Sequence, residues 1–179
     1  MPISRGPGRD DDLNRLRTER VVFTECDFSG VNLAESEHLG SAFRNCNFNL
    51  TTLWHSTFRH CSMLGSVFVR CRMRPLTLDE VDFTLAVLGG NDLRGVDLSG
   101  CRLREANLVE ADLRKTLLCG ADLTGARTTG VRMDDADLRG AAVDPSRCGR
   151  PRRCRGRGWI SRRRWPSRRP MDCGWTASA

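Results

Sequence analysis

A large apolar residue recurs at every fifth position of this chain, from Leu13 to Val143. All seven phenylalanines lie at these positions, and only Thr18, His38 and Thr128 depart from the pattern. An amphipathic helix repeats every 3.6 residues and a strand every two, so neither element explains a strict period of five. The pattern predicts a backbone that turns a corner every five residues.

Four sides of five residues close a square coil of about 20 residues, and successive coils then stack at the β-strand spacing of about 4.8 Å. The large apolar residue of each unit, its centre, points inward together with the small residue two places earlier, and the other three positions face solvent. Centres 20 residues apart share a column, so the sequence predicts an all-β solenoid with a ladder core. The predicted ladder comprises Phe23, Phe28, Phe43, Phe48, Phe58, Phe68, Phe83, Leu103 and Leu123.

Glycine fills the fifth position of these units ten times, as corners with positive φ require. Pro75 interrupts this series, and Leu76 is larger than the small inward position normally accepts. We therefore expect a local bulge or loop between Arg74 and Asp79.

Several residues of metal-binding type fall within the repeat. His38 replaces an apolar centre, where we expect a hydrogen-bonded core histidine rather than a ligand. His55 and His60 stand near Cys61 in sequence, but they fall at solvent-facing corners on different sides of the coil. Five of the nine cysteines take the small inward position, so we interpret them as buried packing residues in a reducing compartment and predict no metal site. These five are Cys26, Cys46, Cys61, Cys71 and Cys101.

The sequence offers no catalytic constellation. It contains no glycine-rich dinucleotide motif, no P-loop and no nucleophile elbow, and an outward Ser or Asp on a rod has no pocket that perturbs its pKa. We therefore expect a protein that is not an enzyme and uses no cofactor. No apolar run approaches the roughly 18 residues of a membrane span, and no signal peptide is recognisable, which predicts a cytoplasmic protein.

The net charge of +7 is concentrated at the two ends of the chain. Residues 144–179 hold 11 arginines and two acids, and residues 1–9 add two arginines, so residues 10–143 carry a net charge of −4. The chain thus divides into an irregular N-terminal segment (1–9), a repeat region (10–143) and an arginine-rich tail (144–179).

The tail fits no coil, no amphipathic helix and no obvious domain. One hypothesis is a basic arm that binds nucleic acid. The other is a disordered or out-of-frame tail. The codons for Trp159 to Ala177, read one base earlier, permit an alanine-rich helix that ends at a glycine, so we favour a frameshift near Ser146.

The tandem units ADLTG, ADLRG and NDLRG resemble the pentapeptide-repeat family. The resemblance covers about three-quarters of the chain and implies a right-handed quadrilateral β-helix. Longer stretches, such as CDFSGVNLAES and PLTLDEVDFTLAVLGGNDLRG, are similar to the mycobacterial fluoroquinolone-resistance members of that family. This implies an acidic rod that mimics duplex DNA, inhibits DNA gyrase and protects it from fluoroquinolones. It also implies a homodimer through a short C-terminal helical segment, which is not expected here if the tail is out of frame.

Residues 76–143 supply the acidic surface that such mimicry needs, with 12 acids against eight bases, whereas residues 10–75 balance eight against eight. Asp79, Glu80, Asp97 and Asp137 share one side, which is the most DNA-like. Aspartate in the second position also caps turns, so a generic structural or protein-interaction rod and a nucleic-acid binder acting through the tail remain alternatives. The candidate residues for binding gyrase, a protein partner, are Asp79, Glu80, Asp82, Asp92, Asp97, Glu105, Glu110, Asp112, Asp122, Asp134, Asp135 and Asp137.

Overall fold

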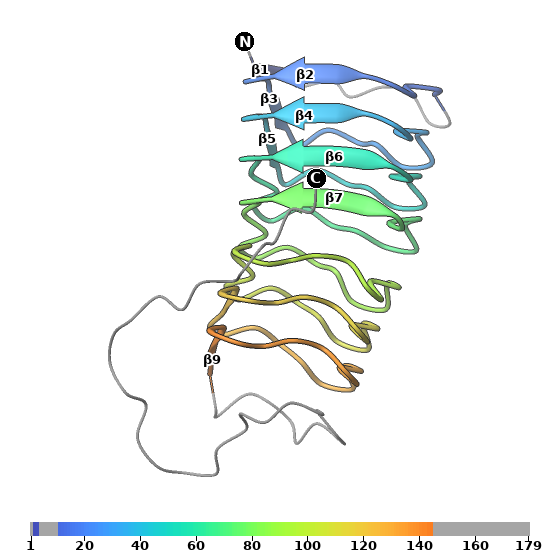
Figure 1. Ribbon diagram of the computed structural model, residues 1–179. Coiled ribbons are helices and arrows are strands. Elements are labelled where there is room, and N and C mark those ends of the chain that lie inside the picture. The colour runs from blue at the N-terminus through green and yellow to red at the C-terminus, as the bar shows by residue number, and fades with distance from the viewer. Residues whose placement is uncertain (1, 4–10, 145–179) are drawn as a thin grey trace, which may run out of the picture.

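A square β-solenoid dominates the computed structural model, which describes residues 2–3 and 11–144. The fold is the predicted right-handed quadrilateral β-helix, with about six turns (Figure 1). The predicted N-terminal segment is described only at two residues, and the basic-arm and frameshift hypotheses concern residues that lie outside the described part. The strands are β1 (Pro2–Ile3), β2 (Arg17–Glu19), β3 (Val22–Thr24), β4 (Glu37–Leu39), β5 (Ala42–Arg44), β6 (Ser56–Arg59), β7 (Leu76–Asp79), β8 (Asp122–Leu123) and β9 (Ala142–Val143).

Every strand pair is parallel and offset by 20 residues, which is one turn of the coil. The sheets run β1-β3-β5, β2-β4-β6-β7 and β8-β9. Phe23 pairs with Phe43 and His38 with Phe58. Isolated bridges continue the same register where the strands are too short to be assigned, as between Arg102 and Asp122.

The four sides of the coil are named faces A to D in chain order. Face A begins with residues 21–25, face B with 26–30, face C with 31–35 and face D with 36–40, and each recurs every 20 residues along the chain. In Figure 1 face D, with β2, β4, β6 and β7, is turned toward the viewer, and β1, β3 and β5 of face A lie at its left. Faces B and D are therefore opposite sides of the rod.

Backbone hydrogen bonds join each coil to its neighbours. The N–H of Leu33 donates to the carbonyl of Thr52 at 2.8 Å, and the N–H of Thr52 donates back to the carbonyl of Val31 at 3.1 Å. The same exchange recurs along all four faces. These bonds satisfy the backbone groups that a parallel stack would otherwise bury without partners.

The corners explain the five-residue period. Between residues 15 and 140, every position ending in 0 or 5 except Pro75 has positive φ, namely ten glycines and fifteen other residues. Proline cannot adopt positive φ, and the peptide bond between Arg74 and Pro75 is cis. The expectation of a bulge or loop there is wrong, because β7 pairs with β6 in unbroken register. The N–H of His55 still donates to the Pro75 carbonyl at 2.7 Å, so the coil keeps its path through this corner.

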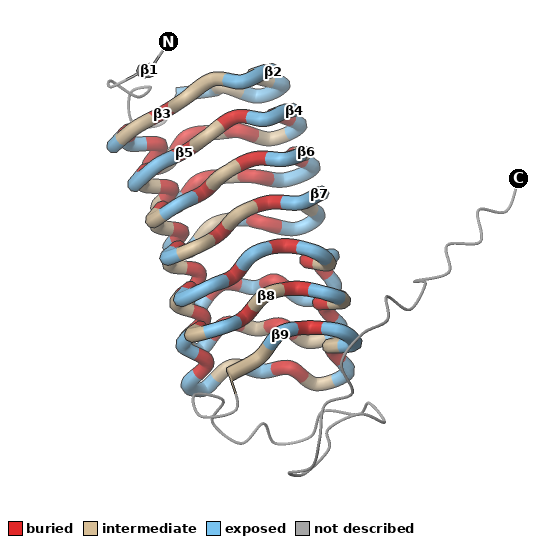
Figure 2. The backbone as a smooth tube through the Cα atoms, turned by 90° about the vertical axis from the view of Figure 1, so that its left-hand side faces the viewer, coloured by how far each residue is buried: buried red, intermediate tan, exposed pale blue. Residues whose placement is uncertain are grey.

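The inward columns form one continuous core along the rod (Figure 2). All nine residues of the predicted ladder are buried, from Phe23 to Leu123. Phe28, Phe48 and Phe68 stack in one column, with ring centroids 5.0 and 4.7 Å apart. Because the rings repeat at the coil spacing, each phenylalanine packs against the coil above and the coil below.

Polar residues in the small inward position are tied to backbone carbonyls of the preceding coil. The hydroxyl of Thr51 donates to the Phe28 carbonyl at 2.8 Å, and that of Ser66 to the Phe43 carbonyl at the same distance. No buried side-chain nitrogen or oxygen of the described residues lacks a hydrogen-bond partner. This is why Ser and Thr alternate with Ala and Val in this position without a cost for burial.

The cysteines of the small inward position also serve packing. Four of the five are buried and Cys71 is partly buried, and all are free thiols. Burial raises the pKa of Cys46 and Cys101 to about 11 and that of Cys71 to about 12. These thiols are therefore protonated near neutral pH and are poor nucleophiles.

His38 is a satisfied core residue, as expected. It is 2% exposed and stacks on Phe58 with ring centroids 4.6 Å apart. Its Nδ1 lies 2.6 Å from the Thr18 hydroxyl and its Nε2 lies 3.0 Å from the Ser36 hydroxyl. Burial lowers the pKa of His38 from 6.5 to about 4, so the ring is neutral at neutral pH.

The buried histidine predicts a specific acid sensitivity. Because the folded-state pKa is below the unfolded value, protonation favours the unfolded chain, and stability falls as the pH drops from 6.5 to about 4. The expected loss is on the order of 3 kcal/mol in the free energy of unfolding. Urea unfolding at a series of pH values measures it. The variant His38→Phe, which matches Phe58 of the same column, should flatten the curve in this window; an unchanged slope in the variant would contradict the assignment.

Candidate partner-binding face

The twelve candidate acidic residues do not form one patch. Face D carries four of them, face C four, face A three and face B one. This distribution follows from the stacking, because residues whose numbers differ by 20 or a multiple of 20 lie in the same column. By face the residues are Asp79, Glu80, Asp97 and Asp137 on D; Asp92, Asp112, Asp134 and Asp135 on C; Asp82, Glu105 and Asp122 on A; and Glu110 on B.

Five of these carboxylates are paired with arginine. Asp137 lies 2.7 Å from Arg139, whereas the pairs of Asp82 with Arg102 and of Asp122 with Arg104 are looser at 3.9 Å. The other two, Asp92 and Asp112, belong to a network on face C. The sequence contained a usable signal for the tight pairs, because each lies in an Asp-Leu-Arg unit in which both polar side chains point outward.

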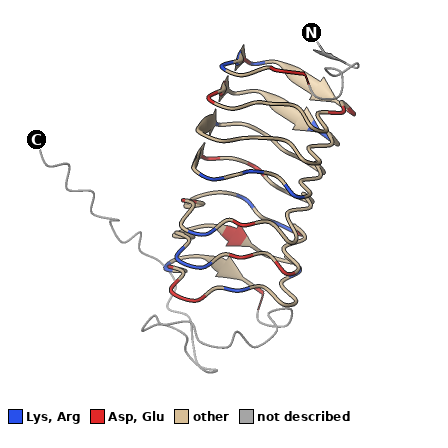
Figure 3. Ribbon diagram, turned by 90° about the vertical axis from the view of Figure 1, so that its right-hand side faces the viewer, with Lys and Arg blue, Asp and Glu red and all other residues tan. Residues whose placement is uncertain are grey.

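On face C the pairs form a chain along the rod axis. Asp92 contacts Arg74 at 2.9 Å and Arg94 at 2.7 Å. Asp112 contacts Arg114 at 2.6 Å and also lies within 4 Å of Arg94. Hydrogen bonds from the Arg94 and Arg114 side chains hold the pKa values of Asp92 and Asp112 below their usual range. Figure 3 shows basic and acidic segments close together on the later coils. Face C therefore offers a partner little net negative charge.

Face D is different over its last four coils, residues 76–80, 96–100, 116–120 and 136–140. These segments hold four acids and one base, Arg139. Among the described residues, no lysine or arginine comes within 4.0 Å of Asp79, Glu80 or Asp97, although His60 lies 3.2 Å from Glu80. We call Asp79, Glu80, Asp97 and Asp137 the acidic face.

The charge spacing of the acidic face is comparable with that of nucleic acid. Asp97 and Asp137 stand in one column with Leu117 between them, and the whole set spans about 14 Å, or three coil steps. Four carboxylates over this length approach the roughly 3.4 Å between charges along one DNA strand, and Arg139 offsets one of the four. Over its last coils face A follows with four acids against two bases, whereas faces B and C have no excess of acids.

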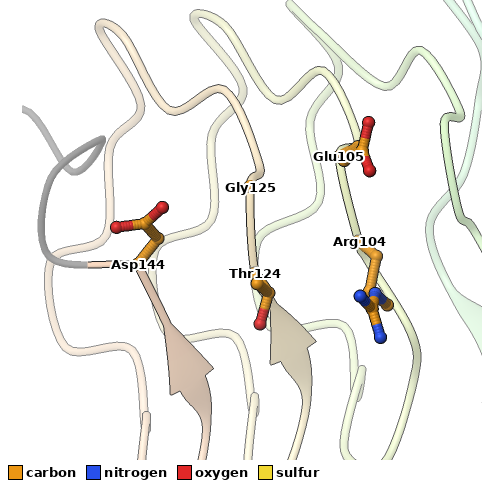
Figure 4. Close-up of a pocket in the computed structure, with 5 residues that line it drawn as sticks. All are labelled: Arg104, Glu105, Thr124, Gly125 and Asp144. Carbon is orange, nitrogen blue, oxygen red and sulfur yellow. The ribbon is translucent and has the colours of Figure 1, made fainter.

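A surface hollow of about 280 Å³ lies where the last coils of face A meet the end of the described chain (Figure 4). No three His, Cys, Asp or Glu side chains within residues 11–144 gather as a metal site requires. In the same part of the chain, no helix is long and apolar enough to cross a membrane. The hollow is lined by Arg104, Glu105, Thr124, Gly125 and Asp144.

Comparison with known families identifies the repeat. A model described as pentapeptide repeats, in eight copies, matches residues 76–104, 82–120 and 106–142. Two relatives carry the same name, pentapeptide repeat protein MfpA. The one from Mycobacterium tuberculosis is 79% identical over 92 residues, which is 51% of this chain and 50% of the relative. The one from Mycolicibacterium smegmatis is 77% identical over 48 residues, 27% of this chain and 25% of the relative.

The match spans about half or less of each relative's own length. Among solved structures, trypsin-treated QnrB1, described as a plasmid-mediated fluoroquinolone resistance protein, aligns with 80% of this chain and 93% of its own. Its sequence identity is 18% and its TM-score is 0.37. This similarity adds nothing to the description of the fold, which the hydrogen bonds between coils and the five-residue repeat define.

Proposed function

Because the repeat region of this chain belongs to the pentapeptide-repeat family, we propose that the protein is a non-catalytic DNA mimic that binds DNA gyrase. In this proposal the acidic face occupies part of the basic surface on which gyrase holds duplex DNA. The protein then inhibits the enzyme and protects it from fluoroquinolones, which act on gyrase that holds DNA.

The observation that carries the proposal is the excess of acids on face D, four against one base over its last four coils, of which Asp79 and Asp97 have no arginine or lysine within 4.0 Å in the described chain. Exposed carboxylates that already contact arginine have part of their charge neutralised, whereas Asp79 and Asp97 retain theirs for a partner. Charge complementarity of this kind steers association and favours a basic surface over a neutral one. The similarity to MfpA relatives and to the fluoroquinolone-resistance members of the family supports gyrase as that partner.

The fold suits such a role because the face is preorganised. Each carboxylate projects from a coil that backbone hydrogen bonds hold to the coil beside it, for example between the N–H of Leu118 and the Asp137 carbonyl at 2.8 Å. Little conformational freedom is lost on binding, so a modest number of charges is enough for useful affinity.

A supercoiling assay tests the proposal. We expect the protein to inhibit gyrase in a dose-dependent way and to lower the yield of fluoroquinolone-stabilised cleavage complexes, because gyrase bound to the mimic cannot hold DNA. A gel-shift assay with duplex DNA alone is the control, since a nucleic-acid binder acting through the tail retards DNA without gyrase. Full supercoiling activity at a large excess of the protein would leave the generic rod as the better description.

A further inference from the structure

Two corners of the rod hold residues that neither the backbone nor the core explains. Of the fifteen non-glycine residues with positive φ, thirteen are polar or charged and two are leucines, Leu50 and Leu85. Positive φ disfavours a bulky side chain, and these leucines gain no burial in exchange, since they are 55% and 52% exposed. Asn45 and Gly65 occupy the corner of Leu85 in the preceding coils, so better-suited residues are available there.

Both leucines border face B. Leu85 ends the neighbouring side of face A, and Leu50 stands at the corner where face B turns into face C. Between them face B carries Val67 and Val87, which are bridged to each other across one coil step, and Val69, which is 39% exposed. The N–H of Leu50 donates to the Val69 carbonyl at 2.8 Å, so the corner and the valines are contiguous. We call these five residues the apolar strip.

The strip is flat and almost uncharged. Gly89 follows on the same face, and a side chain there would meet the Val109 carbonyl at 2.8 Å from its Cβ. Arg70 is the only charged residue of face B between residues 46 and 90. A flat apolar surface in positions that elsewhere hold Asp, Asn and Arg fits another flat apolar surface better than it fits water.

Charge indicates what covers the strip. In a two-fold pair each face meets its own copy, so a face with an excess of one sign repels itself. Face D holds the acidic face, the later coils of face C hold six bases against four acids, and face A has more acids than bases. Face B is balanced in its described residues, with Asp27 and Glu110 against Arg70 and Arg127, and these lie outside or at the edge of the strip.

We propose that two copies of this chain associate side by side through the apolar strip of face B. β-Sheet faces pack at a separation of about 10 Å, which the valines can fill. The acidic faces, on the opposite side of each rod, then point outward. The strip is smaller than the roughly 800 Å² per partner of a standard stable interface, so the pair forms at high protein concentration and dissociates on dilution.

Analytical ultracentrifugation of the full chain, from low micromolar to millimolar concentration, tests this pairing. The test variant Leu50→Asn with Leu85→Asn removes apolar area and places a residue that tolerates positive φ at each corner. The matched control, Leu39→Asn with Leu117→Asn, removes leucines of similar exposure, 46% and 44%, from face D.

The wild-type protein and the control should dimerise with increasing concentration, and the test variant should dimerise at least about tenfold more weakly. The test variant should also keep or raise its melting temperature, because asparagine suits the corner backbone better. A second variant, Val69→Glu, should likewise prevent pairing, because it sets two like charges face to face. A wild-type protein that stays monomeric over the whole range, or a test variant that pairs as the wild type does, would overturn the proposal. Neither result bears on gyrase binding, which uses the opposite face.

Discussion

Neutralising the acidic face is expected to abolish most of the affinity for gyrase without unfolding the rod. The variant replaces the four residues by their amides, Asp79→Asn, Glu80→Gln, Asp97→Asn and Asp137→Asn. If each exposed carboxylate contributes about 0.5–1 kcal/mol to a steered interface, the four together contribute about 2–4 kcal/mol. This corresponds to a loss of affinity of at least about 30-fold.

The matched control removes the same formal charge from the other faces. Glu105→Gln, Glu110→Gln, Asp134→Asn and Asp135→Asn replace four carboxylates that contact no arginine or lysine within 4.0 Å in the described chain, whereas on the acidic face Asp137 contacts Arg139. Isothermal titration calorimetry measures the affinity of each variant for gyrase, and circular dichroism checks that both variants are folded. Equal losses would mean that gyrase senses the net charge of the rod rather than one face.

Truncating the middle of the phenylalanine column is expected to destabilise the rod severely. Phe48 is fully buried, stacks on Phe28 and Phe68, and meets Phe43 edge-on at 5.7 Å. The variant Phe48→Ala leaves a cavity in a tube too narrow to collapse around it, and we expect a loss of about 3–5 kcal/mol in the free energy of unfolding. That is a large share of the stability of a domain of this size.

Equilibrium urea unfolding measures the loss, and Leu39→Ala supplies the comparison. Leu39 is 46% exposed and points outward from face D, so its truncation should change stability by less than about 0.5 kcal/mol. Similar losses in the two variants would contradict the buried ladder as the source of stability.

The repeat made most of the fold predictable from the sequence. A period of five fixes where the centres point, so the burial of Phe48 and Leu103 follows from their positions alone. The same frame placed His38 in the core, where neighbouring hydroxyl groups satisfy it. The prediction of a bulge or loop at Pro75 was wrong. Proline cannot take the positive φ of the other corners, but the peptide bond before it is cis and the Pro75 carbonyl still accepts a hydrogen bond from the N–H of His55.

The candidate site was less predictable, because counting acids ignores their partners. Asp92 and Asp112 were predicted to bind a partner because they are acidic and face solvent. Arginines two residues later in the sequence and one coil away neutralise them. Pairing of this kind depends on which side chains meet across coils, and a list of charges contains no such distances. Asp79 and Asp97 form no ion pair with arginine within 4.0 Å in the described chain, although Arg59 is the register partner of Asp79 one coil away.

If the acidic face takes the place of DNA on gyrase, the protein and duplex DNA compete for the same surface of the enzyme. Fluorescence anisotropy can follow a labelled duplex bound to gyrase while the protein is added. We expect full displacement of the duplex, with a midpoint that rises in proportion to the DNA concentration. The four-residue amide variant should shift this midpoint upward by at least about 30-fold. A ternary complex, in which the protein binds gyrase and the duplex stays bound, would contradict this competition.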